Sequence, residues 1–212
     1  LMPGLAISDG IGYLQSQASQ ILPRDVSVNY SGQSRQYMQE GNALLYAFVF
    51  AIIIIFLVLA AQFESFRDPI IILIAVPMSI CGALIPLNLG AATINIYTQI
   101  GLVTLIGLIS KHGILMVEFA NKLQENEGLD RFAAIIKAAT IRLRAVLMTT
   151  FAMILGVMPL VFASGAGAAS RFDIGIVIAS GMFIGTAFTL FVVPTMYTFF
   201  AKDHNKLSEP SP

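Results

Sequence analysis

Residues 98–117 read T-Q-I-G-L-V-T-L-I-G-L-I-S-K-H-G-I-L-M-V, an almost wholly apolar run that contains Lys111. About 20 apolar residues are what an α-helix needs to cross the hydrocarbon of a bilayer. A lysine near the middle of such a helix costs about 2.5–3.5 kcal/mol on insertion scales, so it requires a partner charge or a water-filled path. The run predicts a transmembrane helix, and Lys111 is its first candidate for a functional residue.

The composition extends this prediction to the whole chain. Of the 212 residues, 57% are hydrophobic and 11% are charged, and the mean hydropathy of +0.81 is too high for a soluble domain. The net charge is zero and no basic block is present, which excludes nucleic acid as a partner. The single cysteine, Cys81, predicts neither a disulfide framework nor a thiolate metal site, and no motif indicates a cofactor.

Apolar stretches of the right length recur along the chain, and we expect an all-α membrane bundle over residues 33–201. The predicted spans lie near 43–62, 69–88, 96–120, 145–164 and 173–200. A topology with the N-terminus outside leaves only Arg24, Arg35 and Arg171 on the outer side. It places these cations on the inner side: Arg67, Lys122, Arg131, Lys137, Arg142, Arg144, Lys202 and Lys206.

Shorter elements flank the spans. Residues 1–32 predict a helix over about 8–20 and a short strand over 26–30, an α/β remnant too short to bury a core. We therefore expect the C-terminal piece of a longer protein, with this remnant facing outward. Residues 129–139 carry apolar side chains on one helical face and predict a short interfacial helix. Residues 202–212 are expected to form a disordered tail on the inner side.

Polar side chains within the third span are the first candidate site. Lys111 has no acid at its own depth. His112 points about 100° away from Lys111, and we expect a neutral histidine hydrogen-bonded to another span, with proton relay as the alternative. Glu118 shares the Lys111 face about 10 Å further along the axis, where it is either a hydrated interfacial carboxylate or a secondary functional residue.

The fourth and fifth spans add two further features. Arg142 and Thr149 are seven residues apart and share a helical face, with Arg142 at the inner mouth and Thr149 about two turns deeper. Thr149 either belongs to a polar pathway or bonds back to its own helix. Gly181 and Gly185 form a GxxxG pattern, which predicts close packing against a neighbouring helix.

Several segments of this sequence resemble the C-terminal end of the resistance–nodulation–division (RND) efflux transporters, in particular the hydrophobe/amphiphile exporter branch of tripartite multidrug pumps. They are 59–66 (L-A-A-Q-F-E-S-F) with Pro69, 106–121 (I-G-L-I-S-K-H-G-I-L-M-V-E-F-A-N), 142–144 (R-L-R) with 147–150 (L-M-T-T), and 156–160 (G-V-M-P-L) leading into 164–168 (S-G-A-G-A). The resemblance covers almost the whole chain in the same order.

The resemblance implies a proton-driven antiporter of the bacterial inner membrane that exports hydrophobic or amphiphilic compounds. The five spans would be the last five of a twelve-span protomer, and residues 1–32 would complete a periplasmic porter subdomain. In such pumps a lysine pairs with two aspartates in a span of the N-terminal half, and Lys111, Arg142 and Thr149 match the proton-pathway residues. The implied partners are two further protomers of a homotrimer, a periplasmic adaptor (membrane-fusion) protein and an outer-membrane channel.

The chain also departs from the family pattern. The aspartate pair and the first seven spans are missing, so we do not expect the chain to transport by itself. Ala145 stands where the family usually has proline, which predicts a local difference in the start of a helix.

The sequence disfavours two other classes of protein. The segments around Lys111 and Arg142 disfavour a non-exporting accessory subunit of protein translocation that is related to the RND family. An intramembrane enzyme is disfavoured because the spans hold no paired aspartates, no H-E-x-x-H and no nucleophile–base pair.

Overall fold

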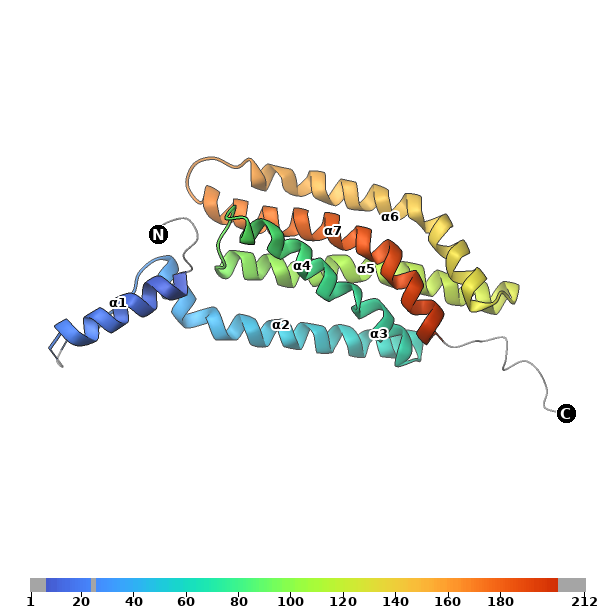
Figure 1. Cartoon of the computed structure of the whole chain (residues 1–212), viewed down its shortest axis with the longest axis horizontal. Coiled ribbons are helices and arrows are strands. Elements are labelled where there is room, and N and C mark those ends of the chain that lie inside the picture. Colours follow the sequence, from blue (N-terminus) through green and yellow to red (C-terminus); the bar gives the residue numbers. More distant parts are fainter. Residues whose placement is uncertain (1–6, 24–25, 202–212) are drawn as a thin grey trace.

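The structure is a computed structural model that describes residues 7–23 and 26–201. Helices account for all the regular secondary structure of these residues (Figure 1). Their bounds are α1 Ile7–Ile21, α2 Gln33–Phe63, α3 Arg67–Leu73, α4 Ala75–Asn88, α5 Ile96–Glu127, α6 Arg131–Val161 and α7 Ala168–Phe200. The tail predicted over 202–212 lies outside the described residues.

The sequence predicts five spans, and the structure contains five helical segments that could form them. Five helical segments are long and apolar enough to cross a membrane: Tyr46–Phe63 of α2, Arg67–Asn88 of α3 with α4, and the whole of α5, α6 and α7. The segment in α2 is the least covered by the rest of the bundle. Its exposed isoleucine, leucine and phenylalanine side chains are suited to contact with lipid.

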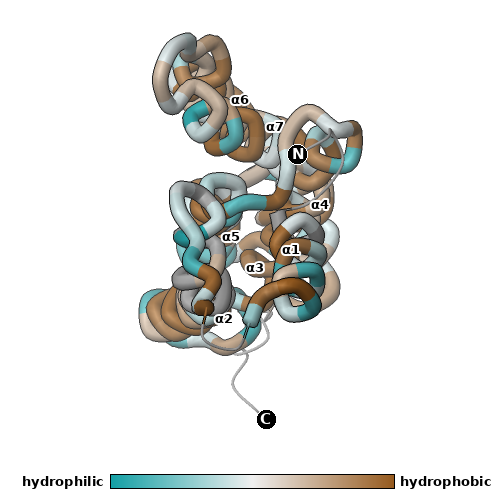
Figure 2. The backbone as a smooth tube through the Cα atoms, turned by 90° about the vertical axis from the view of Figure 1, so that its left-hand side faces the viewer, coloured by the Kyte–Doolittle hydropathy of each residue, from teal (hydrophilic) through white to brown (hydrophobic). Residues whose placement is uncertain are grey.

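The helix α5 is the centre of the bundle. It contacts α2, α3, α4, α6 and α7, while α7 packs on α4, α5 and α6. Figure 2 views the bundle along its length and shows α5 between α6 and α2. The α2–α3 and α5–α6 connections lie at one end, here called the α5–α6 end, and the α4–α5 and α6–α7 connections lie at the other, the α4–α5 end (Figure 1).

The second span, Arg67–Asn88, is interrupted at Ile74, between α3 and α4. Pro77 accounts for the break. Proline has no backbone N–H to donate to the carbonyl of Leu73, four residues earlier, and its ring clashes with that carbonyl. Pro86, Pro159 and Pro194 lie inside helices that continue past them.

Residues 131–139 are the first turns of α6, which runs without interruption to Val161. The separate short helix predicted over 129–139 is therefore joined to the fourth span. The sequence offers no reason for an interruption, because no glycine or proline occurs between Arg131 and Leu155. Figure 1 shows that α6 curves near its start and does not break.

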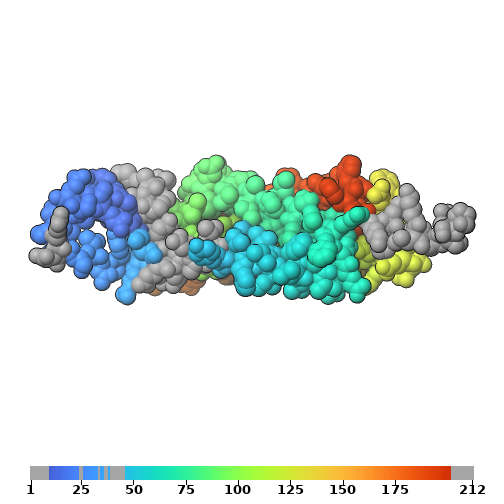
Figure 3. Space-filling model, turned by 90° about the horizontal axis from the view of Figure 1, so that it is seen from below, coloured from blue at the N-terminus to red at the C-terminus, as the bar shows by residue number. Residues whose placement is uncertain are grey.

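The N-terminal segment contains the predicted helix but not the predicted strand. The helix is α1, whereas residues 26–30 form neither helix nor strand. A strand needs a neighbouring strand for its backbone N–H and C=O groups, and the described part of the chain supplies none. Figure 3 shows α1 beyond the end of the bundle, and α2 is the helix it contacts.

Close helix contacts in the core run through glycine. Gly185 on α7 is buried against α4, and a Cβ atom placed on it would lie 2.5 Å from the Cβ of Ser79 and 3.2 Å from its Cα. Gly181, one turn earlier, lies against Leu105 of α5 and Ala83 of α4. The backbone of α7 therefore approaches both neighbours at distances that larger side chains would prevent.

Candidate functional site

One face of α5 is left uncovered by the other described helices. Its members recur every three or four residues, so they lie in a single row along the helix. This uncovered stripe consists of the exposed residues Ile100, Thr104, Gly107, Lys111, Lys122 and Glu125, with the partly exposed Leu115 and Glu118 between them. The opposite faces of α5 carry the buried residues that pack on α3, α4 and α7.

Lys111 lies in the middle of the uncovered stripe. Its side chain is exposed, and none of the carboxylates whose side chains the structure describes forms an ion pair with it. Glu118, two turns along the stripe, is bonded instead to Lys122, with 2.7 Å between Oε1 and Nζ. The described helices thus leave the ammonium of Lys111 without the partner charge that a membrane lysine requires.

The pairing of Glu118 with Lys122 supports the reading of Glu118 as a hydrated residue. Both side chains are substantially exposed, and the two residues are one helical turn apart. Exposed pairs of this kind contribute about 0.3–0.5 kcal/mol. Glu118 therefore lies at the edge of the candidate site. It takes no part in the contacts between α5 and α6 described next.

The contact between α5 and α6, here called the α5–α6 seam, brings together two pairs of polar or aromatic side chains. Nε2 of His112 lies 3.3 Å from Oγ1 of Thr149, and Cζ of Arg142 lies 4.6 Å from the centre of the Phe119 ring. His112 and Phe119 are seven residues apart on α5, and Arg142 and Thr149 are seven apart on α6. Because the helices are antiparallel, the two contacts follow one another along the same line of helix packing. Arg142 lies nearer the α5–α6 end than Thr149 does.

The hydroxyl of Thr149 bonds to its own helix and also faces the neighbouring helix. It donates to its own helix, with the carbonyl oxygens of Ala145 and Val146 each 3.0 Å from Oγ1. The same oxygen faces His112 on the neighbouring helix. A hydroxyl has one proton and two lone pairs, so Thr149 can donate within α6 and accept from α5 at the same time.

Two buried nitrogen atoms on the seam lack a hydrogen-bond partner. They are Nδ1 of His112, a residue with no exposed surface, and Nε of the partly buried Arg142. Unsatisfied buried polar atoms are rare in folded proteins and call for a functional or structural explanation. The seam therefore needs such an explanation at both His112 and Arg142.

A second polar cluster joins three helices by hydrogen bonds at the α5–α6 end, and the sequence did not predict it. The hydroxyl of Tyr197 donates to Asn121 Oδ1, the amide of Asn121 donates to Asp68 at 3.1 Å, and the amide of Gln124 donates to the Tyr197 hydroxyl at 2.7 Å. These contacts join α3, α5 and α7. Only a polar residue at the end of each apolar run signalled them in the sequence, because each of these hydrogen bonds joins residues more than 50 positions apart.

The α4–α5 end is fastened differently. Asn95 caps the first turn of α5 by accepting from the backbone N–H of Thr98, whose hydroxyl accepts from the backbone N–H of Asn95 in return. The side-chain amide of Asn95 also donates to Asp173 on α7. This reciprocal cap fixes where α5 begins and hence the depth at which it holds Lys111.

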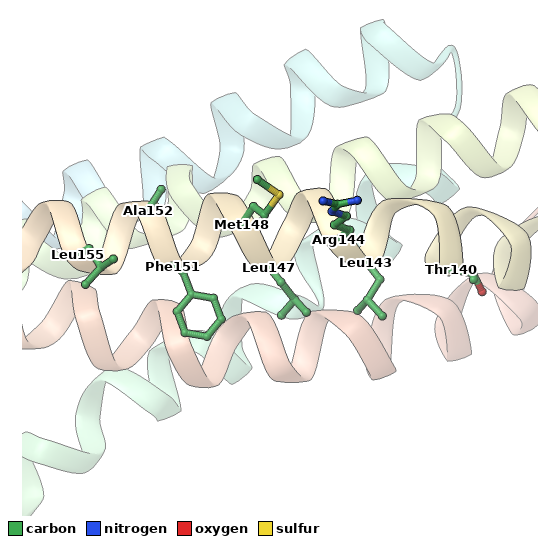
Figure 4. Close-up of a pocket in the computed structure, with 8 residues that line it drawn as sticks. All are labelled: Thr140, Leu143, Arg144, Leu147, Met148, Phe151, Ala152 and Leu155. Atoms are coloured by element: carbon green, nitrogen blue, oxygen red, sulfur yellow. The ribbon is translucent and has the colours of Figure 1, made fainter.

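The remaining surface features carry less chemistry. A shallow groove follows α6 (Figure 4), and its lining is Thr140, Leu143, Arg144, Leu147, Met148, Phe151, Ala152 and Leu155. All eight belong to one helix and most are apolar, as expected for a surface in contact with lipid or a further helix. Among the described residues, no group of three or more His, Cys, Asp or Glu side chains gathers as a metal site would require.

Comparison with known proteins gives consistent matches. The chain matches the AcrB/AcrD/AcrF family over residues 4–201. It is 53% identical to an uncharacterized transporter of Haemophilus influenzae over 97% of its own length. It is 36% identical to the solvent-resistant pump membrane transporter SrpB of Pseudomonas putida over 99% of its length, and 38% identical to the multidrug resistance protein MdtF of Escherichia coli over 83%.

These matches cover only part of each relative. The aligned region is 20% of the Haemophilus influenzae protein, 20% of SrpB and 17% of MdtF, so the chain spans about a fifth of the length of the relatives it matches.

Proposed function

The chain belongs to the AcrB/AcrD/AcrF family of RND transporters, and we propose that it supplies five spans of the membrane domain of a proton-driven pump for hydrophobic or amphiphilic compounds. Members of this family are membrane transporters and not enzymes. The printed functions of two relatives, a solvent-resistant pump and a multidrug resistance protein, support the proposed class of substrate. They also favour an exporter over an accessory subunit of protein translocation.

The observation that carries the proposal is the position of Lys111. It lies on the uncovered stripe of α5, at mid-span, and none of the carboxylates whose side chains are described pairs with it. A cation at this depth needs an opposite charge, and the uncovered stripe has room for another helix to bring one. We propose that carboxylates from the rest of the transporter face Lys111 there, and that binding and release of protons by these acids drives export.

Arg142 and Thr149 complete the proposed proton pathway. The α5–α6 seam holds them in line, with Arg142 nearer the α5–α6 end and Thr149 beside His112. Arg142 would tune the electrostatic potential at the mouth of the pathway, and Thr149 would offer a hydroxyl that both donates and accepts.

The proposed pump works as a larger assembly. The chain spans about a fifth of its relatives, so it is not expected to export by itself. We propose that the complete transporter is a homotrimer in the bacterial inner membrane, that residues 1–32 belong to its periplasmic porter region, and that it works with a periplasmic adaptor and an outer-membrane channel.

The orientation in the membrane gives one test. The distribution of lysine and arginine favours an outward N-terminal segment and an inward α5–α6 end. In a full-length, cysteine-free transporter carrying this segment, Ser31→Cys should react with an impermeant thiol reagent added outside intact cells, and Glu125→Cys should react only after the cells are opened. Both sites are exposed in the structure. The reverse labelling would refute this orientation.

Proton coupling is tested directly in vesicles that contain the purified full-length transporter. Adding substrate should drive proton movement in the wild type. Thr149→Val should lose most of the export and of the proton flux, because valine keeps the shape of threonine and removes the hydroxyl that contacts His112. Thr149→Ser should keep a substantial part of both. Equal activity of the two variants would mean that Thr149 only packs, and a wild type without substrate-dependent proton flux would contradict the proposed function.

A further inference from the structure

We propose that His112 is a proton-binding residue of the pathway, neutral at rest, which takes up and releases a proton at Nδ1 while Thr149 holds Nε2. The proposal rests on the proposed function and adds to it a second ionisable side chain beside Lys111. It follows from the hydrogen bonds of the α5–α6 seam and from the complete burial of the ring.

The contacts of Thr149 decide which nitrogen of His112 carries the proton. The single proton of the Thr149 hydroxyl is directed to the carbonyl oxygens of its own helix, both closer to Oγ1 than the histidine is. Oγ1 therefore accepts at the histidine contact, and Nε2 of His112 donates. In a neutral imidazole the other nitrogen is then an acceptor, so Nδ1 presents a free lone pair.

The free lone pair is buried and unused. Nδ1 of His112 has no hydrogen-bond partner in the described structure, and the residue has no exposed surface. A histidine that served only to join two helices would be expected to satisfy both nitrogens, because an unsatisfied buried acceptor costs about 1–3 kcal/mol. An acceptor kept vacant in a proton pathway has a direct use as a place where a proton binds.

The charges around His112 make the proton binding conditional. Lys111 precedes it on α5, and Arg142 lies one step of the seam away, beside Phe119. The α3 contact next to His112 joins Gly113 to Ile72 and brings no charge. On α7, the titratable residues Asp173 and Tyr197 are hydrogen-bonded at the two opposite ends of the helix.

The adjacent charged residue, Lys111, is a cation and disfavours an imidazolium. His112 accepts a proton when the positive charge of Lys111 is neutralised by its partner or lost, and it releases the proton when that charge returns. In this step an N–H bond forms at Nδ1 as the donor, a hydrated proton or a carboxylic acid of the pathway, loses its proton. The reverse step restores the neutral ring, and Nε2 keeps its proton throughout.

The test compares variants that separate hydrogen bonding from proton binding. His112→Gln places an amide N–H near the position of Nε2, so it keeps a donor for Thr149 but cannot titrate. His112→Asn places its amide nearer the position of Nδ1 and loses the Thr149 contact. The control is His204→Gln, which changes the other histidine of the chain. Export and proton flux are measured in vesicles of the full-length transporter across about pH 5–8, the range in which histidine ordinarily changes charge.

We expect His112→Gln to reach wild-type abundance, to lose export turnover by about tenfold or more, and to lose the pH dependence of the wild type in this range. His112→Asn should be at least as impaired, and His204→Gln should match the wild type. A His112→Gln variant with the wild-type pH profile, at either normal or reduced turnover, would overturn the proposal, because packing alone then explains His112. The proposed function fails separately, if the wild type itself shows no substrate-driven proton flux.

Discussion

Lys111→Ala should abolish export by a full-length transporter that carries this segment, while leaving its membrane abundance and trimer assembly close to those of the wild type. The side chain lies on the uncovered stripe of α5 and fills no space between the described helices, so its removal leaves the core of the five spans intact. What it removes is the positive charge that the proposed carboxylate partners face. Drug and solvent resistance of cells that make equal amounts of each protein is the measurement.

Lys122 provides the matched control for Lys111. It lies on the same stripe, is exposed, and is bonded to Glu118 on the same helix. Exposed pairs contribute about 0–1 kcal/mol, so Lys122→Ala should retain nearly full resistance. Wild-type resistance from Lys111→Ala, or equal loss from both variants, would argue against a specific role for Lys111.

Gly185→Leu should prevent the bundle from reaching its native packing. The Cβ alone would lie 2.5 Å from the Cβ of Ser79 and 3.2 Å from its Cα, and a backbone atom cannot move aside as a flexible side chain can. Overpacking typically costs about 1–3 kcal/mol and sometimes more, which is large against a total stability of about 5–15 kcal/mol. The measurement is the amount of monodisperse protein in detergent and its loss on heating.

Gly156 on α6 is the control for this substitution. It is also a helical glycine, but apart from the adjoining backbone of its own helix no atom lies within 4 Å of the position that its Cβ would occupy. Gly156→Leu should therefore assemble and resist heating much as the wild type does. If the two leucine variants were equally stable, the close approach of α7 to α4 would not be a constraint on the fold.

The spans were predictable from the sequence because their signal is local. About 20 apolar residues in a row specify a membrane helix whatever surrounds it. The break at Ile74 was harder to foresee, since proline often lies inside membrane helices without ending them, and Pro86 and Pro159 do so here. The join of residues 131–139 to the fourth span was not predicted, because the change in polarity along the sequence suggested a boundary where the helix α6 in fact continues.

The site was predictable only residue by residue. Charged and polar side chains in apolar runs identified Lys111, Arg142 and Thr149 as candidates, and helical periodicity gave the face shared by the last two. The contact between His112 and Thr149 was not predictable, because it depends on the antiparallel register of α5 and α6. The hydrogen bonds that join Asp68, Asn121 and Tyr197 were not predictable for the same reason, because they connect helices that are remote in the sequence.

The dense contact between α4 and α7 sets an order of events during biosynthesis. Gly82 packs on Ile184 and Ser79 on Gly185, so roughly 100 residues must be translated after α4 before its partner exists, which takes about 5–20 s at ribosomal speed. During that interval α4 can pack only on α3 and α5, and the face that α7 will cover stays in lipid, which is possible because the backbone hydrogen bonds of a helix are internal. Synthesis that stopped before α7 would leave the small-residue face of α4 bare in the bilayer, open to capture by a membrane protease.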